Sequence, residues 1–240
     1  MTVGANLDVS VLVLAGGRGT RIQAIHPETP KPMIAVAGKP FLHWLTMFLG
    51  GFGLSHFVYS TGYRSEAIEA WCGDGSLPGI DRVACREPAP LGTGGGVLNC
   101  LHLCRDWVLV ANGDGLCIGG IPELLALRVE PGLAGGIIGV EVLDAGRYGS
   151  LAFDGTNRLT AFREKVPGHG YINSGLYLFR RTALEALRRD GACSMEQDLV
   201  PELIAAGADL RVVPLGEAAF IDIGTPETLA QAEAFVRQNL

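Results

Sequence analysis

Apolar and polar residues alternate in blocks along the first half of the chain, as they do where strands and helices follow one another. Val9 to Leu14 is an almost unbroken run of β-branched residues and leucine, which predicts a buried strand that ends in a glycine-rich loop. Similar blocks predict strands at 57–60, 81–86 and 107–111 and helices at 41–50, 64–72 and 94–104. Such alternation is typical of a parallel sheet covered by helices on both faces, so we expect a doubly wound α/β fold.

Strands dominate the second half of the chain. After a short helix at 122–129, strands are predicted at 135–142, 150–153, 158–164 and 171–179, with Asp154-Gly155 as a hairpin turn. Further elements are predicted as helices at 182–188 and 194–206, strands at 210–214 and 219–223, and a last helix from Thr225 to about Gln238. No linker-like stretch or internal repeat interrupts the pattern, which predicts a single domain over residues 1–240. It would comprise a ligand-binding half at about 9–130, a β-rich insertion at about 131–224 and a C-terminal helix at 225–240.

Composition and charge narrow the possible functions. The 240 residues are 48% hydrophobic and 18% charged, which is enough apolar surface for a sizeable core and excludes intrinsic disorder. A net charge of −6 provides no positive field for nucleic acid, so any anionic ligand must be held by locally placed cations. Residues 1–10 lack the pattern of a signal peptide, and no apolar run has the length of a membrane span. We expect a cytoplasmic protein with no nucleic-acid or membrane partner, acting on a small phosphorylated metabolite.

The chain has six cysteines and no CxxC pair. Because there is no secretion signal, a disulfide framework is not expected and we predict free thiols. Cys100, His102 and Cys104 resemble metal ligands, but leucines surround them and the two cysteines are one helical turn apart. We expect these cysteines to be buried structural thiols rather than a metal site.

A glycine-rich loop, residues 16–21, follows the first predicted strand. Its glycine spacing differs from GxGxxG, and no Gly-Lys-Ser/Thr follows, so it is neither the dinucleotide fingerprint nor a P-loop. Open α/β sheets bind ligands at the carboxyl ends of their strands, where backbone N–H groups and arginines such as Arg18 and Arg21 can hold phosphates. A turn that needs glycine only for its geometry is the alternative. Farther along, two prolines flank Lys31 and stiffen the chain around a cation, although it could also be an ordinary loop lysine.

Two aspartates lie in turns beside apolar runs. Asp114 follows the strand predicted at 107–111, and Asp222 lies within the strand predicted at 219–223. A carboxylate in such a place is costly if it is left unpaired, so each needs a cation or several N–H donors. Capping of the last helix is the alternative for Asp222, although Thr225 is better placed for that. Two carboxylates at strand ends of one sheet could together hold Mg²⁺, with water and substrate phosphates as its other ligands.

Two further groups of residues are candidates for substrate binding. Lys165, after Glu164, ends one predicted strand and Asn173 begins the next, so the two could face one pocket; a solvated Glu-Lys pair is the alternative. Residues 87–96 start with Glu87 and contain a run of glycines. Glycine there would let the backbone approach a planar base or a sugar without a side chain in between.

In order and spacing these motifs resemble those of the sugar-1-phosphate nucleotidylyltransferases, over essentially the whole chain. The segments that carry the resemblance are Leu14-Ala-Gly-Gly-Arg-Gly-Thr-Arg21, Pro30-Lys-Pro-Met33, Glu87 to Gly96, Asn112-Gly-Asp114, Glu164-Lys165, Ile172-Asn-Ser-Gly175 and Ile221-Asp-Ile-Gly224. Within that family the chain is most similar to the D-glycero-α-D-manno-heptose 1-phosphate guanylyltransferases. This closer similarity lies in Tyr148-Gly149, the Glu-Lys pair followed by Ile-Asn-x-Gly, and the Pro-x-Gly-Thr-Gly-Gly loop.

The resemblance implies a Rossmann-like nucleotidyltransferase fold, with a mostly parallel sheet, a nucleotide-binding first half and a sugar-binding β-rich insertion. The implied catalytic residues are Arg21, Lys31 and Asp114, and the implied ligands of a Mg²⁺ cofactor are Asp114 and Asp222. The implied nucleotide-binding residues are Leu14, Ala15, Gly16, Gly17, Gly19, Thr20, Arg21, Glu87, Gly92, Thr93 and Asn112. Those implied for the sugar phosphate are Tyr148, Gly149, Glu164, Lys165 and Asn173. The product would be a precursor of cell-surface polysaccharide. The sequence leaves open whether the chain forms a homo-oligomer.

The implied reaction is attack by a sugar 1-phosphate oxygen on the α-phosphorus of a nucleoside triphosphate, with release of pyrophosphate. A phosphate monoester has a second pKa of about 6, so the nucleophile is mostly dianionic at neutral pH and needs no general base. In keeping with this, none of the five histidines lies in a motif. Catalysis then depends on cations that bring two polyanions together in line.

Glu87 favours GTP as the nucleotide, because the resemblance places it at the Watson–Crick edge of the base. An ionised carboxylate only accepts hydrogen bonds, and guanine offers it two donors where uracil offers one. For the sugar, the resemblance implies a heptose with the manno configuration, so we expect transfer from GTP to D-glycero-α-D-manno-heptose 1-phosphate, giving GDP-heptose and pyrophosphate. A uridylyltransferase and a mannose-1-phosphate guanylyltransferase are the alternatives, and Glu87 could instead cap its own turn. Remoter alternatives are a non-catalytic subunit that binds sugar nucleotides and a dinucleotide-dependent oxidoreductase, which the missing GxGxxG disfavours.

Overall fold

The central sheet of the computed structural model contains four neighbouring parallel strands, which confirms the doubly wound arrangement expected of the first half. The structure describes residues 8–146, 149–164 and 167–240. β1 (Val9–Leu14) lies between β4 (His56–Thr61) and β6 (Trp107–Asn112), and β5 (Asp81–Arg86) pairs with β4. All four strands therefore end at the same edge of the sheet, where a ligand site is expected.

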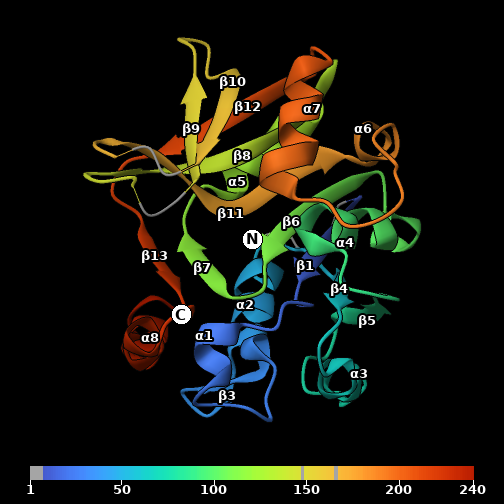
Figure 1. Cartoon of the computed structure of the whole chain (residues 1–240), viewed down its shortest axis with the longest axis vertical. Coiled ribbons are helices and arrows are strands. Elements are labelled where there is room, and N and C mark those ends of the chain that lie inside the picture. Colours follow the sequence, from blue (N-terminus) through green and yellow to red (C-terminus); the bar gives the residue numbers. More distant parts are fainter. Residues whose placement is uncertain (1–7, 147–148, 165–166) are drawn as a thin grey trace.

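The β-rich second half continues the same sheet. β11 (Gly170–Arg180) pairs antiparallel with β6, and it also pairs antiparallel with β8 (Leu133–Val142) and β9 (Gly149–Phe153). β12 (Asp209–Leu215) joins β8 in parallel, and β10 (Leu159–Glu164) forms the predicted hairpin with β9. Figure 1 shows β8 to β12 on one side of β6 and β1, β4 and β5 on the other. The second half is thus joined edge to edge through β11, rather than packed on a face of the parallel strands.

Helices cover both faces of the sheet, because side chains along each strand alternate between two hydrophobic cores. In β1, Val11 and Val13 lie in one core and Leu12 lies in the other, and all three are fully buried. The first core also contains residues of α2 (Phe41–Gly50), α3 (Ser65–Cys72), α5 (Ile121–Ala126) and α8 (Pro226–Asn239). The second contains residues of α4 (Gly92–Cys100), α6 (Arg181–Glu185) and α7 (Val200–Ala205).

Several short elements were not predicted from the sequence pattern. They are α1 (Thr20–Gln23), a 3₁₀ turn at Lys31–Met33, β2 (Ala35–Val36), β3 (Lys39–Pro40) and β7 (Gly115–Ile118). β7 pairs with β13 (Ala219–Asp222) in a two-stranded ribbon of its own. This corrects the expectation that Asp114 and Asp222 lie at strand ends of one sheet: the ribbon, not the central sheet, positions Asp222.

Three of the expected helices are each divided into an α-helix and a short segment of 3₁₀ or π-helix. α4 ends at Cys100 and is followed by a 3₁₀ turn, Leu101–Leu103, and α5 is followed by another, Leu127–Val129. The helix expected at 194–206 begins as a π-helix, Met195–Leu199, before α7. Because Pro201 has no backbone N–H, the regular helical hydrogen bond cannot form where the π-helix passes into α7.

The six cysteines are free thiols, as predicted, and the side chain of Cys100 is fully buried. Among the described residues, no helix has both the length and the apolar character needed to cross a bilayer.

Candidate functional site

A cavity of about 670 Å³ lies at the carboxyl ends of the parallel strands. Its walls come from the segments that follow β1, β4, β5 and β6, because all of these strands end at this edge. The lining residues are Leu14, Ala15, Gly16, Gly17, Arg18, Gly19, Lys31, Pro32, Gly62, Tyr63, Arg86, Glu87, Pro88, Ala89, Pro90, Gly92, Thr93, Asn112 and Asp114. The fold therefore brings together most of the residues that the sequence assigned to nucleotide binding.

The glycine-rich loop packs tightly between two charged side chains. Gly19 has a φ of +56°, and a Cβ there would lie 3.0 Å from the Cβ of Lys31. A Cβ on Gly16 would lie 2.7 Å from Oε1 of Glu87. Glycine at these two positions is thus required by the close approach of Lys31 and Glu87, in addition to the turn at Gly19.

Lys31 is a cation on the wall of this cavity. Pro30 and Pro32 flank it in the one-turn 3₁₀ helix, and its side chain is only 12% exposed. Its Nζ lies 2.5 Å from Oδ2 of Asp114. Asp114 therefore has the cationic partner that a carboxylate in this position requires.

The ribbon of β7 and β13 brings Asp222 close to Asp114. Asp222 is the last residue of β13, and the N–H of Ile223 donates to the backbone oxygen of Asp114 at 2.9 Å. The N–H of Gly224 donates to Oδ1 of Asp222 at 2.8 Å. A Cβ on Gly224 would lie 3.4 Å from Nζ of Lys31, so the turn that holds Asp222 also lies against the lysine.

A second cavity, of about 270 Å³, meets the first at two shared residues. It is lined by Asn112, Asp114, Gly115, Gly149, Phe162, Asn173, Ser174, Gly175, Glu196, Phe220 and Asp222. Asn112 and Asp114 line both cavities. Two of the residues predicted for the sugar phosphate, Gly149 and Asn173, line this second cavity, which makes it the candidate sugar-phosphate cavity.

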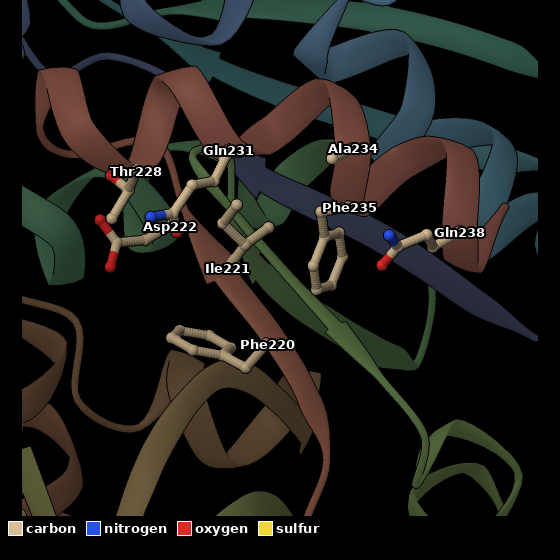
Figure 2. Close-up of a pocket in the computed structure, with 8 residues that line it drawn as sticks. All are labelled: Phe220, Ile221, Asp222, Thr228, Gln231, Ala234, Phe235 and Gln238. Carbon is tan, nitrogen blue, oxygen red and sulfur yellow. The ribbon is translucent and has the colours of Figure 1, made fainter.

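Asp222 also lines a groove of about 300 Å³ between β13 and α8. Figure 2 shows Asp222 at one end of this groove, next to Thr228 near the start of α8, with Phe235 and Gln238 toward the other end. The hydroxyl of Thr225, rather than Asp222, caps α8 by accepting from the N–H of Thr228 at 3.3 Å. The Asp222 carboxylate is therefore not required as a helix cap.

The two aspartates have the chemistry of ligands for a hard divalent cation. Both are half-buried and line the same cavity, and carboxylate oxygens are preferred ligands of such ions. Asp114 uses Oδ2 toward Lys31 and Asp222 uses Oδ1 toward Gly224, which leaves each residue a second carboxylate oxygen. Within residues 8–146, 149–164 and 167–240 there is no cluster of three or more His, Cys, Asp or Glu able to hold a metal. Water and phosphate oxygens would have to complete the coordination shell.

Glu87 is held within its own turn at the wall of the large cavity. Its Oε2 accepts from the N–H of Leu91 at 3.0 Å, and its Oε1 accepts from the hydroxyl of Ser60 at 3.1 Å. The turn contact that we considered as an alternative is therefore present. A carboxylate oxygen can accept more than one hydrogen bond, so these contacts orient Glu87 without using all of its lone pairs. Its role toward a base stays a prediction.

The arginine of the glycine-rich loop that lines the cavity is Arg18, not Arg21 as expected. Gly19 takes the left-handed conformation as the N-cap of α1, and Thr20 and Arg21 begin that helix with exposed side chains. Neither Thr20 nor Arg21 is among the residues that line the cavity. The turn at Gly19 therefore directs the chain away from the cavity two residues before the motif ends.

The sugar-phosphate residues are only partly within the described chain. Tyr148 and Lys165 lie outside the described residues, and Glu164 is described only as the last backbone position of β10. Asn173 lies inside β11 rather than at the start of a strand, and its Nδ2 donates to the hydroxyl of Tyr177 at 2.5 Å. Burial raises the pKa of Tyr177 well above its ordinary value, so this hydroxyl keeps its proton.

Among the polar and charged residues of the two cavities, Tyr63, Arg86 and Glu196 were not singled out from the sequence. Tyr63 and Arg86 lie just after β4 and at the end of β5, so the rule that ligands bind at the carboxyl ends of parallel strands could have found them. Glu196 lies on the π-helix, far along the chain, and its contact with Thr93 brings it to the site. No local sequence signal marks that contact.

Comparison with known proteins places this geometry in context. Residues 10–239 match the family model described as Nucleotidyl transferase. The mannose-1-phosphate guanylyltransferase of Mycobacterium tuberculosis is 34% identical over 234 residues, which are 96% of this chain and 65% of that protein. The chain thus spans less than two thirds of that relative's length.

Two shorter relatives match over nearly their whole length. The D-glycero-α-D-manno-heptose 1-phosphate guanylyltransferase of Aneurinibacillus thermoaerophilus is 29% identical over 227 residues, which are 94% of this chain and 97% of that protein. The crystal structure of HddC from Yersinia pseudotuberculosis complexed with GMP-PN superposes with a TM-score of 0.81 at 30% identity. That superposition covers 94% of this chain and 98% of HddC.

Proposed function

The chain belongs to the nucleotidyl transferase family, and we propose that it transfers the guanylyl group of GTP to D-glycero-α-D-manno-heptose 1-phosphate, giving GDP-heptose and pyrophosphate. The observation that carries this proposal is the pair of cavities that meet at Asn112 and Asp114. Two substrates that react with each other need adjoining subsites with the reacting atoms at the boundary. The heptose guanylyltransferase relative, which this chain matches along nearly its whole length, supports the choice of sugar.

In the proposed reaction, an oxygen of the sugar 1-phosphate attacks the α-phosphorus of GTP. A bond from that oxygen to the α-phosphorus forms, and the bond from the α-phosphorus to the bridging oxygen breaks as pyrophosphate leaves. The attacking phosphate is mostly dianionic at neutral pH, so no proton has to be removed from it. Consistent with this, no histidine is found among the described residues that line either cavity.

Lys31 is placed to stabilise charge at the boundary between the cavities. Its ammonium group is shielded from water and fixed by Asp114, so it needs little reorganisation when negative charge develops on the leaving pyrophosphate. Arg18, which lines the large cavity, takes the part beside the triphosphate that the motif suggested for Arg21. Lys165 would neutralise the incoming sugar phosphate.

Asp114 and Asp222 would hold Mg²⁺, because they supply hard oxygen ligands on the wall of the sugar-phosphate cavity. When bound, the ion would supply positive charge next to the reacting phosphates. In the protein itself, the ion pair with Lys31 orients the Asp114 side chain at this boundary.

Glu87 supports GTP as the nucleotide. It lines the large cavity, and its two hydrogen bonds to Leu91 and Ser60 fix its carboxylate there. A fixed acceptor is better satisfied by the N1–H and amino group of guanine than by the single N–H of uracil. The complex of HddC with GMP-PN agrees with a guanine nucleotide in a related fold.

A mannose-1-phosphate guanylyltransferase is the second candidate, because the mycobacterial relative has the higher sequence identity, 34%. Both candidate reactions use GTP and a sugar 1-phosphate with the manno configuration. The two sugar phosphates differ only in the carbons outside the sugar ring. The signature of the non-catalytic alternative would be loss of a metal aspartate, Arg21 or Lys31, and all of these residues are present. The oxidoreductase alternative does not agree with the family.

Product analysis tests the proposed reaction. The purified chain is incubated with GTP, D-glycero-α-D-manno-heptose 1-phosphate and Mg²⁺, and the nucleotides are separated by anion exchange and identified by mass. We expect GDP-heptose and pyrophosphate in equal amounts. Pyrophosphate that accumulates with GMP and without any sugar nucleotide would instead indicate hydrolysis and contradict the proposal.

A further inference from the structure

A chain of side-chain hydrogen bonds runs from one cavity to the other through Glu196. The hydroxyl of Thr93, in the large cavity, donates to Oε2 of Glu196 at 3.0 Å. Oε1 of Glu196 accepts from the hydroxyl of Tyr177 at 3.0 Å, and that hydroxyl accepts from Nδ2 of Asn173. Asn173 and Glu196 themselves line the smaller cavity. One carboxylate thus binds Thr93 of the large cavity directly and Asn173 of the smaller cavity through Tyr177.

The backbone that carries Glu196 is locked to the start of α4. The hydroxyl of Ser194 accepts from the N–H groups of Glu196 and Gln197, both at 3.1 Å, and donates to Oε2 of Glu196 at 2.9 Å. The hydroxyl of Thr93 accepts from the N–H of Met195 at 2.9 Å. Single π-helical turns occur frequently at functional sites, and this one places Glu196 on the wall of the smaller cavity and in contact with Thr93 of the large one.

Gly92 and Gly94 of the 92–96 run are required by this same contact. A Cβ on Gly92 would lie 2.6 Å from the backbone oxygen of Cys193, and a Cβ on Gly94 would lie 2.9 Å from the carbonyl carbon of Ser194. We expected this run to admit a base or a sugar. In the structure, the absence of side chains on Gly92 and Gly94 lets the segment that carries Glu196 approach closely. The start of α4, which forms part of the wall of the large cavity, therefore packs directly against this segment.

The orientation of Asn173 depends on Glu196 through a single buried hydroxyl. Tyr177 is fully buried, and burial raises the pKa of this phenol, so it carries one proton. The hydroxyl donates its hydrogen bond to Glu196, and its oxygen accepts a hydrogen bond from Asn173. Oδ1 of Asn173 accepts from the N–H of Gly175 at 3.0 Å, which leaves the second N–H of the amide for a ligand.

We propose that Glu196 is a positioning residue that couples nucleotide binding at Thr93 to sugar-phosphate binding at Asn173, an inference that rests on the proposed function. A nucleotide that contacts Thr93 would stabilise its hydrogen bond to Glu196, and through Tyr177 it would stabilise the orientation of Asn173 that receives the sugar phosphate. Because coupling between two binding sites is reciprocal, the sugar phosphate strengthens nucleotide binding by the same factor.

The test measures this coupling directly. The affinity of α,β-methylene GTP, which cannot transfer its nucleotidyl group, is determined by calorimetry with and without saturating D-glycero-α-D-manno-heptose 1-phosphate. We expect the sugar phosphate to tighten binding by about fivefold or more in the unmodified chain. In Glu196→Gln the factor should fall to near one, because an amide cannot accept from both Tyr177 and Thr93. Glu202→Gln, an exposed change on α7 where Glu202 pairs with Arg189, is the matched control and should retain the coupling.

Two further variants separate coupling from a merely structural role, including the case in which Glu196→Gln does not fold. Thr93→Val should raise KM for the sugar phosphate although Thr93 lines the nucleotide cavity, and Tyr177→Phe should raise KM for GTP. The inference is overturned if each change affects only the substrate of its own side, or if the unmodified chain or Glu202→Gln shows no coupling. If the unmodified chain makes no GDP-sugar at all, it is the proposed function that fails.

Discussion

Lys31 and Asp114 form an ion pair where the two cavities meet, with Nζ of Lys31 2.5 Å from Oδ2 of Asp114. The two residues come from separate loops, after β1 and after β6, and these strands are neighbours in the sheet. The lysine side chain is 12% exposed and the aspartate side chain 39% exposed, so the pair is shielded on the lysine side. A cation that is fixed and partly desolvated at this boundary is suited to stabilise phosphate charge.

We expect Lys31→Met to lower kcat by about 10²-fold, since it removes a preorganised charge while keeping most of the side-chain length. Lys39→Met is the matched control, because Lys39 is exposed, and its kcat should stay close to that of the unmodified chain. Steady-state pyrophosphate release at saturating substrates provides the measurement. A Lys31→Met enzyme with kcat within about threefold of the unmodified enzyme would remove Lys31 from the catalytic residues.

Asp114→Asn and Asp222→Asn should each lower turnover by about 10²-fold or more, because a metal clamp contributes several kcal/mol of charge stabilisation. Both variants should need a higher Mg²⁺ concentration for half-maximal activity, and a chelator should abolish the activity of the unmodified chain. Asp190→Asn, an exposed change outside the cavities, serves as the control. Near-normal activity in either site variant, or full activity with the chelator present, would contradict the metal assignment.

Glu87→Gln should reduce the preference for GTP over UTP and also lower the stability of the fold. An amide has one acceptor oxygen, so it cannot accept from both Leu91 and Ser60, and the unmatched donor costs about 1–3 kcal/mol. Ser60→Ala removes only one of these donors and keeps the carboxylate, so it should retain the preference for GTP. The ratio of kcat/KM for the two nucleotides distinguishes them. If Glu87→Gln leaves that ratio unchanged, Glu87 serves only its turn.

The stability of the protein should fall as the pH decreases below about 6.5, in part because of His56. Burial lowers the pKa of His56 below its ordinary value of 6.5, although Asp81 lies 3.7 Å away. The unfolded chain then takes up a proton at a higher pH than the folded chain. The free energy of unfolding therefore becomes smaller as the pH is lowered through this range. His56→Gln should reduce that slope in chemical unfolding between pH 7.5 and 5.5, whereas exposed His102→Gln should not. Equal slopes in all three proteins would contradict this account.

The fold was predictable where local signals mark the ends of an element. β1, β5 and α2 have the bounds that the pattern indicated. β1 and α2 are largely apolar blocks that stop at glycine, and β5 ends at a polar turn that contains proline. β7 was not predictable. It has only four residues, and its pairing with β13, a segment far along the chain, defines it as a strand.

The candidate site follows the same division. The glycine-rich loop and Asp114 were found because they follow parallel strands, whose carboxyl ends meet in any doubly wound sheet. Lys31 was found because two prolines flank it. The placement of Arg18 instead of Arg21 depends on the left-handed turn at Gly19, which the motif alone does not fix. Glu196 depends on a contact between distant segments, for which a single sequence contains no local sign.

Pyrophosphate release, measured for GTP, ATP, UTP and CTP against several sugar 1-phosphates, tests the central claim most directly. The sugar phosphates should include D-glycero-α-D-manno-heptose 1-phosphate, mannose 1-phosphate and glucose 1-phosphate. We expect the highest kcat/KM for GTP with the heptose phosphate, and a lower value for GTP with mannose 1-phosphate. A preference for UTP by about tenfold or more with any of these sugar phosphates would contradict the assignment as a guanylyltransferase.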